Sequence, residues 1–355
     1  MGAEVDETGT GMENIEIVDC DLHLTEVPDE ELRPYLPPRY KDRGVTIPTS
    51  GYAHPHGRRI SDTGQGWSES NTPENMQSHL DTYGIDCGIV TGSTHIIGLS
   101  QHPNRDYAVE LARAHNEFVA EEWLSVDDRL FASIVVPPQD PSEAVELIKE
   151  FGERPRFVQV IMGSGCDYAY GHEKFWPIYR AAVEHNLPVA IHPSHDGAGI
   201  GHMQSPPSNY FELHNQYPMR YMTHVNSLIV EGVFEKFQNL EFICIEGGFA
   251  WVPQLMWRMD KNWRGLRDQA PWLTQPPSDY IRENVRFTTQ PMVEPETDDQ
   301  LLSLLKMMHA EDVLMFSSDF PHWDGDDPTL VLPHSTPAAI QENILYRTAI
   351  DTYSL

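Results

Sequence analysis

The chain has 355 residues, of which 40% are hydrophobic, and its 54 acidic residues outnumber 24 basic ones to give a formal net charge of −30. A surface with this charge repels phosphate groups, which excludes nucleic acid and anionic membranes as partners. No apolar run is long enough for a transmembrane helix, and residues 1–14 lack the apolar segment of a secretory signal. We therefore expect a cytoplasmic protein with a flexible acidic N-terminus over residues 1–14.

The acidic excess also bears on the source of the protein. Strong salt screens the repulsion between like charges on a protein surface, so a large acidic excess indicates a halophilic protein. An acidic protein from a low-salt organism is the alternative. The four cysteines are scattered without a CxxC pair, which favours buried free thiols over a disulfide framework or a zinc knuckle.

Eight short apolar runs alternate with helix-like stretches along the chain. The runs cover residues 15–20, 87–92, 130–136, 156–162, 187–192, 240–248, 284–289 and 313–319. The helix-like stretches cover residues 104–124, 142–151, 172–186, 227–237, 251–263, 297–308 and 336–351. Near-continuous apolar strands separated by helices predict a parallel sheet that is buried on both faces.

Eight is the number of strands that closes a (β/α)8 TIM barrel, and an open doubly wound sheet is the alternative α/β fold. No GxGxxG loop follows the first strand, so we assign no nucleotide. Residues 40–72 lack periodicity and are rich in Gly, Pro, Ser and His. A loop of this length is a lid, a binding loop or a disordered segment.

The same loop carries Arg58 and Arg59 near two histidines. These arginines are candidate substrate-binding residues, because they could bring positive charge to a carboxylate. A solvated basic loop is the alternative interpretation.

Polar side chains follow several of the predicted strands. Asp21 and His23 alternate at the end of the first strand and therefore share one face, and His192, Glu246 and Asp319 come at the ends of the fifth, sixth and eighth strands. In a barrel these ends converge. Burying several carboxylates together is costly unless a cation neutralises them, so the pattern predicts a divalent metal site.

The predicted ligands are Asp21, His23, His192 and Asp319. Two nitrogen and two oxygen donors suit zinc, which we favour, and also manganese or iron(II). The structural alternatives are a His–Asp pair at a strand end, a core histidine at position 192 and a helix N-cap at Asp319.

Three further residues are candidates beside the predicted ligands. Glu246 is a candidate catalytic group, with a purely structural role in its loop as the alternative. His195 and His322 are candidate substrate contacts, with the alternative that they are ordinary loop residues.

The chain resembles the amidohydrolase superfamily, in the branch that includes aminocarboxymuconate-semialdehyde decarboxylase. The segments that carry the resemblance are "DCDLHLTEVPDEELRPYLPPRY", "MQSHLDTYGIDCGIV", "DRLFASIVVPPQDPSEAVELI", "LPVAIHP", "GVFEKFQNLEFICIEGGFAWVPQLMWRMDKNW" and "FSSDFPHWDG". The resemblance implies one distorted (β/α)8 barrel domain over residues 15–355, with residues 40–72 as a lid-like insertion after the first strand. It also implies one divalent metal ion at the four predicted ligands, and it suggests a homodimer.

Two positions depart from the family pattern. The first-strand pair in these decarboxylases is often His-x-His or Glu-x-His, whereas this chain has Asp21 and His23. The well-studied decarboxylases carry a proton-handling histidine at the end of strand six, where this chain has Glu246. A glutamate can do the same work if burial raises its pKa toward neutrality. The alternatives are that Glu246 is an additional metal ligand or that it supports one of the ligands.

By this resemblance the chain is a metal-dependent enzyme that acts on a small molecule. Our first hypothesis is a non-oxidative decarboxylase of a small unsaturated or aromatic carboxylic acid, in which Glu246 or Asp319 handles the proton. The second is a hydrolase of an amide, lactone or C–C bond that uses a metal-bound water, with Asp319 as base and Glu246 as acid. The third is a metal-binding scaffold without activity. Release of carbon dioxide, as opposed to addition of water, separates the first two.

Overall fold

The computed structural model describes residues 16–24, 27, 29–41, 72–194 and 207–355. Residues 1–14, nearly all of the 40–72 insertion with Arg58 and Arg59, and His195 lie outside the described residues, so the predictions made for them stay predictions.

Eight parallel strands pair in the order of the sequence. They are β1 (Val18–Leu24), β2 (Cys87–Ser93), β3 (Leu130–Val135), β4 (Phe157–Gly163), β5 (Val189–His192), β6 (Phe242–Cys244), β7 (Val285–Thr288) and β8 (Leu314–Met315). The backbone N–H of Cys20 donates to the Phe316 carbonyl at 3.0 Å, and that of His23 donates to the Phe320 carbonyl at 2.8 Å. These bonds join the segment after β8 to β1 and close the barrel, which confirms the predicted (β/α)8 fold.

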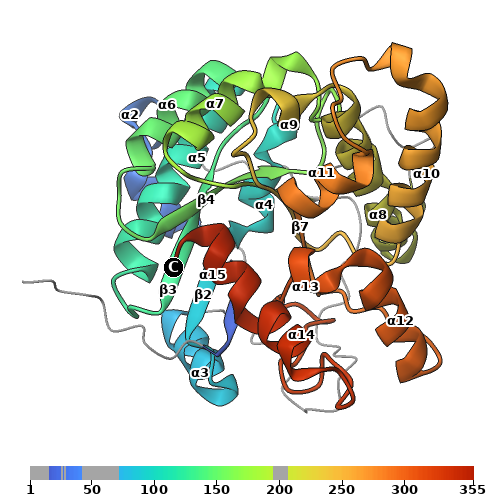
Figure 1. The fold of residues 1–355 in the computed structure, drawn as a ribbon. Coiled ribbons are helices and arrows are strands. Elements are labelled where there is room, and N and C mark those ends of the chain that lie inside the picture. Colours follow the sequence, from blue (N-terminus) through green and yellow to red (C-terminus); the bar gives the residue numbers. More distant parts are fainter. Residues whose placement is uncertain (1–15, 25–26, 28, 42–71, 195–206) are drawn as a thin grey trace, which may run out of the picture.

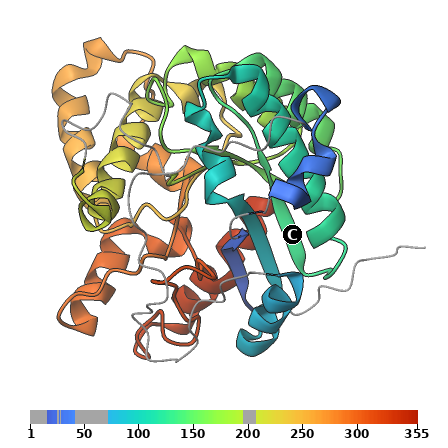
Figure 2. The same ribbon diagram turned by 180° about the vertical axis from the view of Figure 1, so that it is seen from behind.

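Helices surround the strands on the outside of the barrel (Figures 1 and 2). The longer ones are α3 (Pro73–Tyr83), α5 (Arg105–Phe118), α6 (Pro141–Phe151), α7 (Trp176–Glu184), α8 (Tyr210–Val230), α10 (Val252–Leu266), α11 (Pro277–Asn284) and α12 (Asp298–Met308). The shorter ones are α1 (Asp29–Leu32), α2 (Pro38–Lys41), α4 (Thr94–Ile97), α9 (Val233–Lys236), α13 (Ala310–Val313), α14 (Ala338–Glu342) and α15 (Thr348–Tyr353). No helix in the described part of the chain is both long and apolar enough to cross a membrane.

The predicted strand starts lie within about three residues of the observed ones, but three strand ends differ. β1 continues to Leu24, so Asp21 and His23 lie inside the strand rather than at its end. β6 and β8 are shorter than predicted, and the backbone after each of them turns into a left-handed conformation, at Glu246 (φ 56°) and at Asp319 (φ 58°). Extended pairing cannot continue through such residues.

Helix α8 begins 17 residues before the predicted helix at 227. The Asn209 side chain caps it by accepting a hydrogen bond from the Glu212 N–H at 3.0 Å. The polar residues of its first half and the internal Pro218 hide the helical pattern in the sequence. Tertiary packing still supports the helix, because Leu213, Tyr217 and Tyr221 are buried.

Candidate metal centre

Five side chains converge at the carboxyl ends of the barrel strands. Asp21 and His23 come from β1, His192 is the last residue of β5, and Glu246 and Asp319 follow β6 and β8. Each offers one ligand atom, and these atoms all lie within 4.8 Å of one another. All five residues are buried. The structure therefore brings the four predicted ligands together and adds Glu246 to them.

Both imidazoles direct Nε2 toward the carboxylates. His23 Nε2 lies 3.2 Å from Asp21 Oδ1 and 3.0 Å from Asp319 Oδ1. His192 Nε2 lies 3.0 Å from Glu246 Oε2 and 3.6 Å from Asp21 Oδ2. The two nitrogens and the carboxylate oxygens thus surround one small central volume.

Backbone carbonyls hold the opposite side of each imidazole. His23 Nδ1 lies 3.0 Å from the Gly92 carbonyl oxygen, and His192 Nδ1 lies 2.5 Å from that of Pro193. A neutral histidine that donates Nδ1–H to a carbonyl presents the Nε2 lone pair, which is the state that binds metals. The Thr91 hydroxyl also fixes the Asp21 carboxylate, donating to Oδ1 at 2.7 Å.

Three of the converging atoms are buried without a hydrogen-bond partner among the described residues. They are Asp21 Oδ2, His192 Nε2 and Asp319 Oδ2. Buried polar atoms without partners are rare and costly, and a bound divalent cation would satisfy all three. Imidazole and carboxylate donors fit zinc, manganese and iron(II). The residues present therefore fit the predicted metal ion.

Burial and proximity shift the pKa values of this cluster in opposing directions. Burial raises the pKa of Asp319 to about 7 against the opposing effect of His23, and burial together with the Asp319 charge raises the pKa of Glu246. Burial disfavours the charged imidazole of His192, but the Asp21 carboxylate outweighs it and raises the pKa to about 9. The His192 imidazole thus holds a proton when no cation is bound, and a bound divalent cation would take the place of this proton.

Glu246 and Asp319 both have left-handed backbone conformations. For residues other than glycine such conformations cost roughly 1–3 kcal/mol and cluster at functional sites. Hydrogen bonds hold both residues: the Glu246 N–H donates to the Thr288 hydroxyl at 3.0 Å, and the Asp319 N–H donates to the Asp21 carbonyl at 3.1 Å. The fold therefore sustains local strain to direct these two carboxylates into the cluster.

His322, a predicted substrate contact, lies against the cluster. Its Nδ1 lies 2.6 Å from Asp319 Oδ1, and its ring stacks on that of His23 with centroids 4.2 Å apart. Burial and the nearby His23 charge lower the pKa of His322 to about 3, so the ring is neutral and Nδ1–H donates to the carboxylate. A substrate contact by His322 stays a prediction.

The structure adds two residues that the sequence analysis missed. His214 of α8 places Nε2 3.2 Å from Asp324 Oδ2 and 3.9 Å from Glu246 Oε1. The rings of Tyr210, Tyr217 and Trp323 lie 5.4–5.9 Å from the His214 ring. Tyr210, His214, Tyr217 and Tyr221 recur at helical spacing, and this pattern could have placed His214 on the inner face of a helix.

Comparison with known proteins identifies the family. The family model described as Amidohydrolase matches residues 18–355. The chain belongs to this amidohydrolase family. The match confirms the predicted resemblance to the amidohydrolase superfamily.

Within this family, the gamma-resorcylate decarboxylase of Rhizobium sp. strain MTP-10005 is 24% identical over 268 residues, which cover 68% of this chain and 74% of the relative. A solved amidohydrolase from Mycobacterium avium subsp. paratuberculosis K-10 has a TM-score of 0.73 and 18% identity, covering 96% of this chain and 99% of the other. A dihydroxybenzoic acid decarboxylase from Polaromonas sp. JS666, solved with manganese and the inhibitor 2-nitroresorcinol, has a TM-score of 0.67 and 17% identity, covering 96% and 98%. At these identities the solved structures establish the shared fold.

Proposed function

We propose that this protein is a metal-dependent, non-oxidative decarboxylase of a small aromatic carboxylic acid. The observation that carries the proposal is the buried cluster of two imidazoles and three carboxylates at the carboxyl ends of the strands, the end where TIM-barrel enzymes place their chemistry. The relatives named gamma-resorcylate decarboxylase support the reaction class.

Asp21, His23, His192 and Asp319 would hold the divalent ion. When bound, the ion supplies positive charge that binds the carboxylate of the substrate and a neighbouring oxygen. Manganese is the ion in the Polaromonas neighbour, and the donor set also suits zinc, the ion that the sequence analysis favoured, so both ions belong in the first assays.

Decarboxylation breaks the bond between the ring carbon and the carboxylate carbon, and a proton takes the place of carbon dioxide. The enzyme must therefore deliver one proton to a carbon atom. Efficient general acids have pKa values near the working pH, and burial raises the pKa of Glu246, which is not among the four predicted ligands. We assign proton handling to Glu246 and Asp319, whose ligand atoms lie within 4.8 Å of each other.

The acidic cluster also limits the substrate. Three carboxylates around one divalent cation sum to a charge of −1, so every further anionic group on a substrate adds repulsion. We therefore expect a monocarboxylate with neutral hydroxyl groups, with Arg58, Arg59 and His195 as predicted further contacts.

A homodimer in the cytoplasm remains our prediction for the assembly and its location.

The test is a product assay in deuterated water. Enzyme loaded with Mn²⁺ or Zn²⁺ is incubated with 2,6-dihydroxybenzoate, with 5-carboxyvanillate, whose second carboxylate should make it the poorer substrate, and with a panel of amides and lactones. The proposal expects carbon dioxide and one deuterium on the ring carbon, with loss of both in Asp319→Asn. Addition of water to an amide or lactone without carbon dioxide would identify a hydrolase and overturn the proposal.

A further inference from the structure

The Glu246 carboxylate lies between two imidazoles that approach from different elements. His192 of β5 faces Oε2 at 3.0 Å, and His214 of α8 faces Oε1 at 3.9 Å. His192 is also a candidate metal ligand, and a nitrogen that binds a metal cannot donate to a carboxylate. Of these two imidazoles, only that of His214 can therefore donate a hydrogen bond to Glu246 when the metal is bound.

A second carboxylate holds His214 from the other side. Asp324 Oδ2 lies 3.2 Å from His214 Nε2, and the side chain of Asp324 is only 7% exposed. His214 Nε2 is nevertheless buried without a hydrogen bond among the described residues. One nitrogen thus pairs with Asp324 at 3.2 Å and also faces the Glu246 carboxylate at 3.9 Å.

We infer that His214, held by Asp324, is a positioning residue that directs the Glu246 carboxylate at the substrate. The inference rests on the proposed function, because it gives Glu246 a role in the decarboxylation. It explains why a partly exposed imidazole from α8 directs a buried nitrogen at a strand end that carries a carboxylate. A role limited to joining α8 to the loop after β8 is the competing explanation.

Three variants separate these explanations. His214→Leu removes the imidazole, and His214→Gln restores an N–H near the position of Nε2. His224→Gln is the matched control on the same helix: His224 Nδ1 accepts from the Tyr170 N–H at 3.2 Å, and its Nε2 lies 2.8 Å from the Ser164 carbonyl oxygen. These contacts do not involve Glu246.

We expect His214→Leu to lower kcat for carbon dioxide release about 10- to 100-fold, with KM and metal content near wild type. His214→Gln should recover most of the loss. His224→Gln should lower Tm and keep kcat. Wild-type kcat in His214→Leu, or a loss that His214→Gln does not recover, would overturn the inference.

A structural measurement makes the test independent of turnover. Crystal structures of the manganese-loaded wild type and of His214→Leu should show the Glu246 carboxylate rotated away from the metal cluster in the variant only. An unmoved Glu246 would overturn the inference. If no acid in the panel is decarboxylated but Glu246 still rotates, the proposed reaction fails and the positioning role stands.

Discussion

His322 Nδ1 lies 2.6 Å from Asp319 Oδ1 while the same imidazole stacks on the ring of His23. One neutral side chain therefore fixes both the strand-eight carboxylate and a first-strand imidazole. Residues that orient metal ligands in this way contribute strongly to metal affinity, although they do not touch the ion.

We predict that His322→Phe, which keeps the stacking on His23 and loses the N–H, weakens metal binding about 10- to 100-fold. His322→Asn keeps a donor near the position of Nδ1 and should retain most of the affinity. Titration of metal-free protein with Mn²⁺ measures both. Equal, wild-type affinities in the two variants would show that the bond to Asp319 has no such role.

The close packing behind Glu246 leads to a second prediction. A Cβ at Gly247 would lie 2.6–2.9 Å from atoms of the Tyr221 ring, whose hydroxyl bonds to the Ile245 carbonyl at the same strand end. Gly247→Ala should therefore displace Glu246 and destabilise the fold by about 1–3 kcal/mol.

The control for this experiment is Gly265 in helix α10, where a Cβ would meet no atom within 4 Å. Gly265→Ala should stabilise the protein by up to about 1 kcal/mol. Denaturant unfolding of both variants measures the difference. A Gly247→Ala protein as stable as Gly265→Ala would contradict the described packing.

The third prediction concerns acid stability. Burial lowers the pKa of His115 to about 4, and its Nε2 accepts from the Ser93 N–H at 3.4 Å. The unfolded chain binds this proton from about pH 6.5 and the folded chain only near pH 4, so stability falls as the pH drops through this window.

The shift corresponds to about 3 kcal/mol lost between pH 6.5 and 4. His115→Gln keeps an acceptor near the position of Nε2 and does not titrate, so its stability should fall less over the same range. Chemical denaturation at half-unit pH steps measures both slopes. Parallel slopes would show that His115 is protonated in the folded state.

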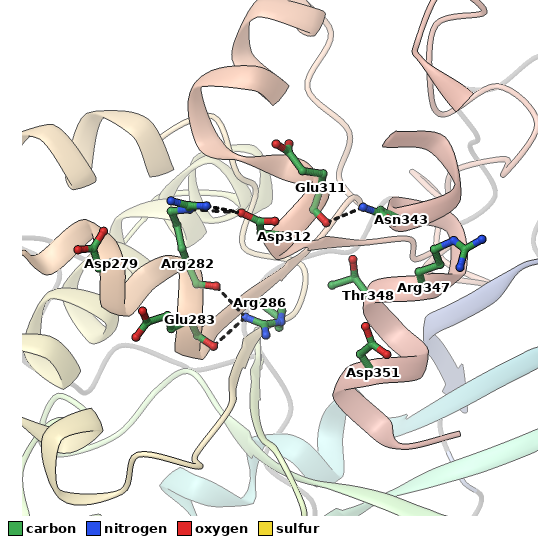
Figure 3. A pocket seen from close by; sticks show the side chains of 10 residues that line it. All are labelled: Asp279, Arg282, Glu283, Arg286, Glu311, Asp312, Asn343, Arg347, Thr348 and Asp351. Carbon is green, nitrogen blue, oxygen red and sulfur yellow. Dashed lines mark hydrogen bonds and ion pairs between the residues drawn. The ribbon is translucent and has the colours of Figure 1, made fainter. Parts of the chain in front are cut away.

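The fourth prediction concerns salt. A cavity of about 520 Å³ between α11, α13 and α15 has more acidic than arginine side chains on its wall (Figure 3). Arg282 faces Asp312 at 2.8 Å, and Arg347 pairs with Glu342 outside the lining at 2.8 Å. The full lining is Asp279, Arg282, Glu283, Arg286, Glu311, Asp312, Asn343, Arg347, Thr348 and Asp351.

This local excess of acidic side chains has the same sign as the net charge of −30 of the whole chain. Raising the salt concentration from 0.1 M to 1 M shortens the screening length from about 10 Å to about 3 Å. We expect Tm to rise over this range in KCl, as the halophilic interpretation requires. A Tm that falls or stays level in KCl would favour an ordinary acidic protein.

The strands could be predicted because each is a short apolar run, buried on both faces of a closed barrel. The convergence of four polar side chains could be predicted, because polar residues that end or interrupt buried apolar strands meet at one end of a barrel. These residues are Asp21, His23, His192 and Asp319. The left-handed conformations of Glu246 and Asp319, which follow β6 and β8, could not be predicted, because no sequence pattern marks such a conformation in residues other than glycine.

His214 and Asp324 were missed for a different reason. His214 lies in a polar half-helix that is stable only through its packing on the barrel, and Asp324 lies in a loop without periodicity. The contacts of His214 with Glu246 and Asp324 depend on tertiary structure, and Asp324 lies 110 positions after His214 in the chain.

The most direct test of the central claim is elemental analysis of the protein purified in high salt and reconstituted with Mn²⁺ or Zn²⁺, comparing the wild type with His192→Ala and the control His224→Gln. The account predicts about one equivalent of metal ion per chain in the wild type and the control, and loss of the ion in His192→Ala. A wild type that binds no metal, or a His192→Ala variant that keeps it, would contradict the metal centre described above.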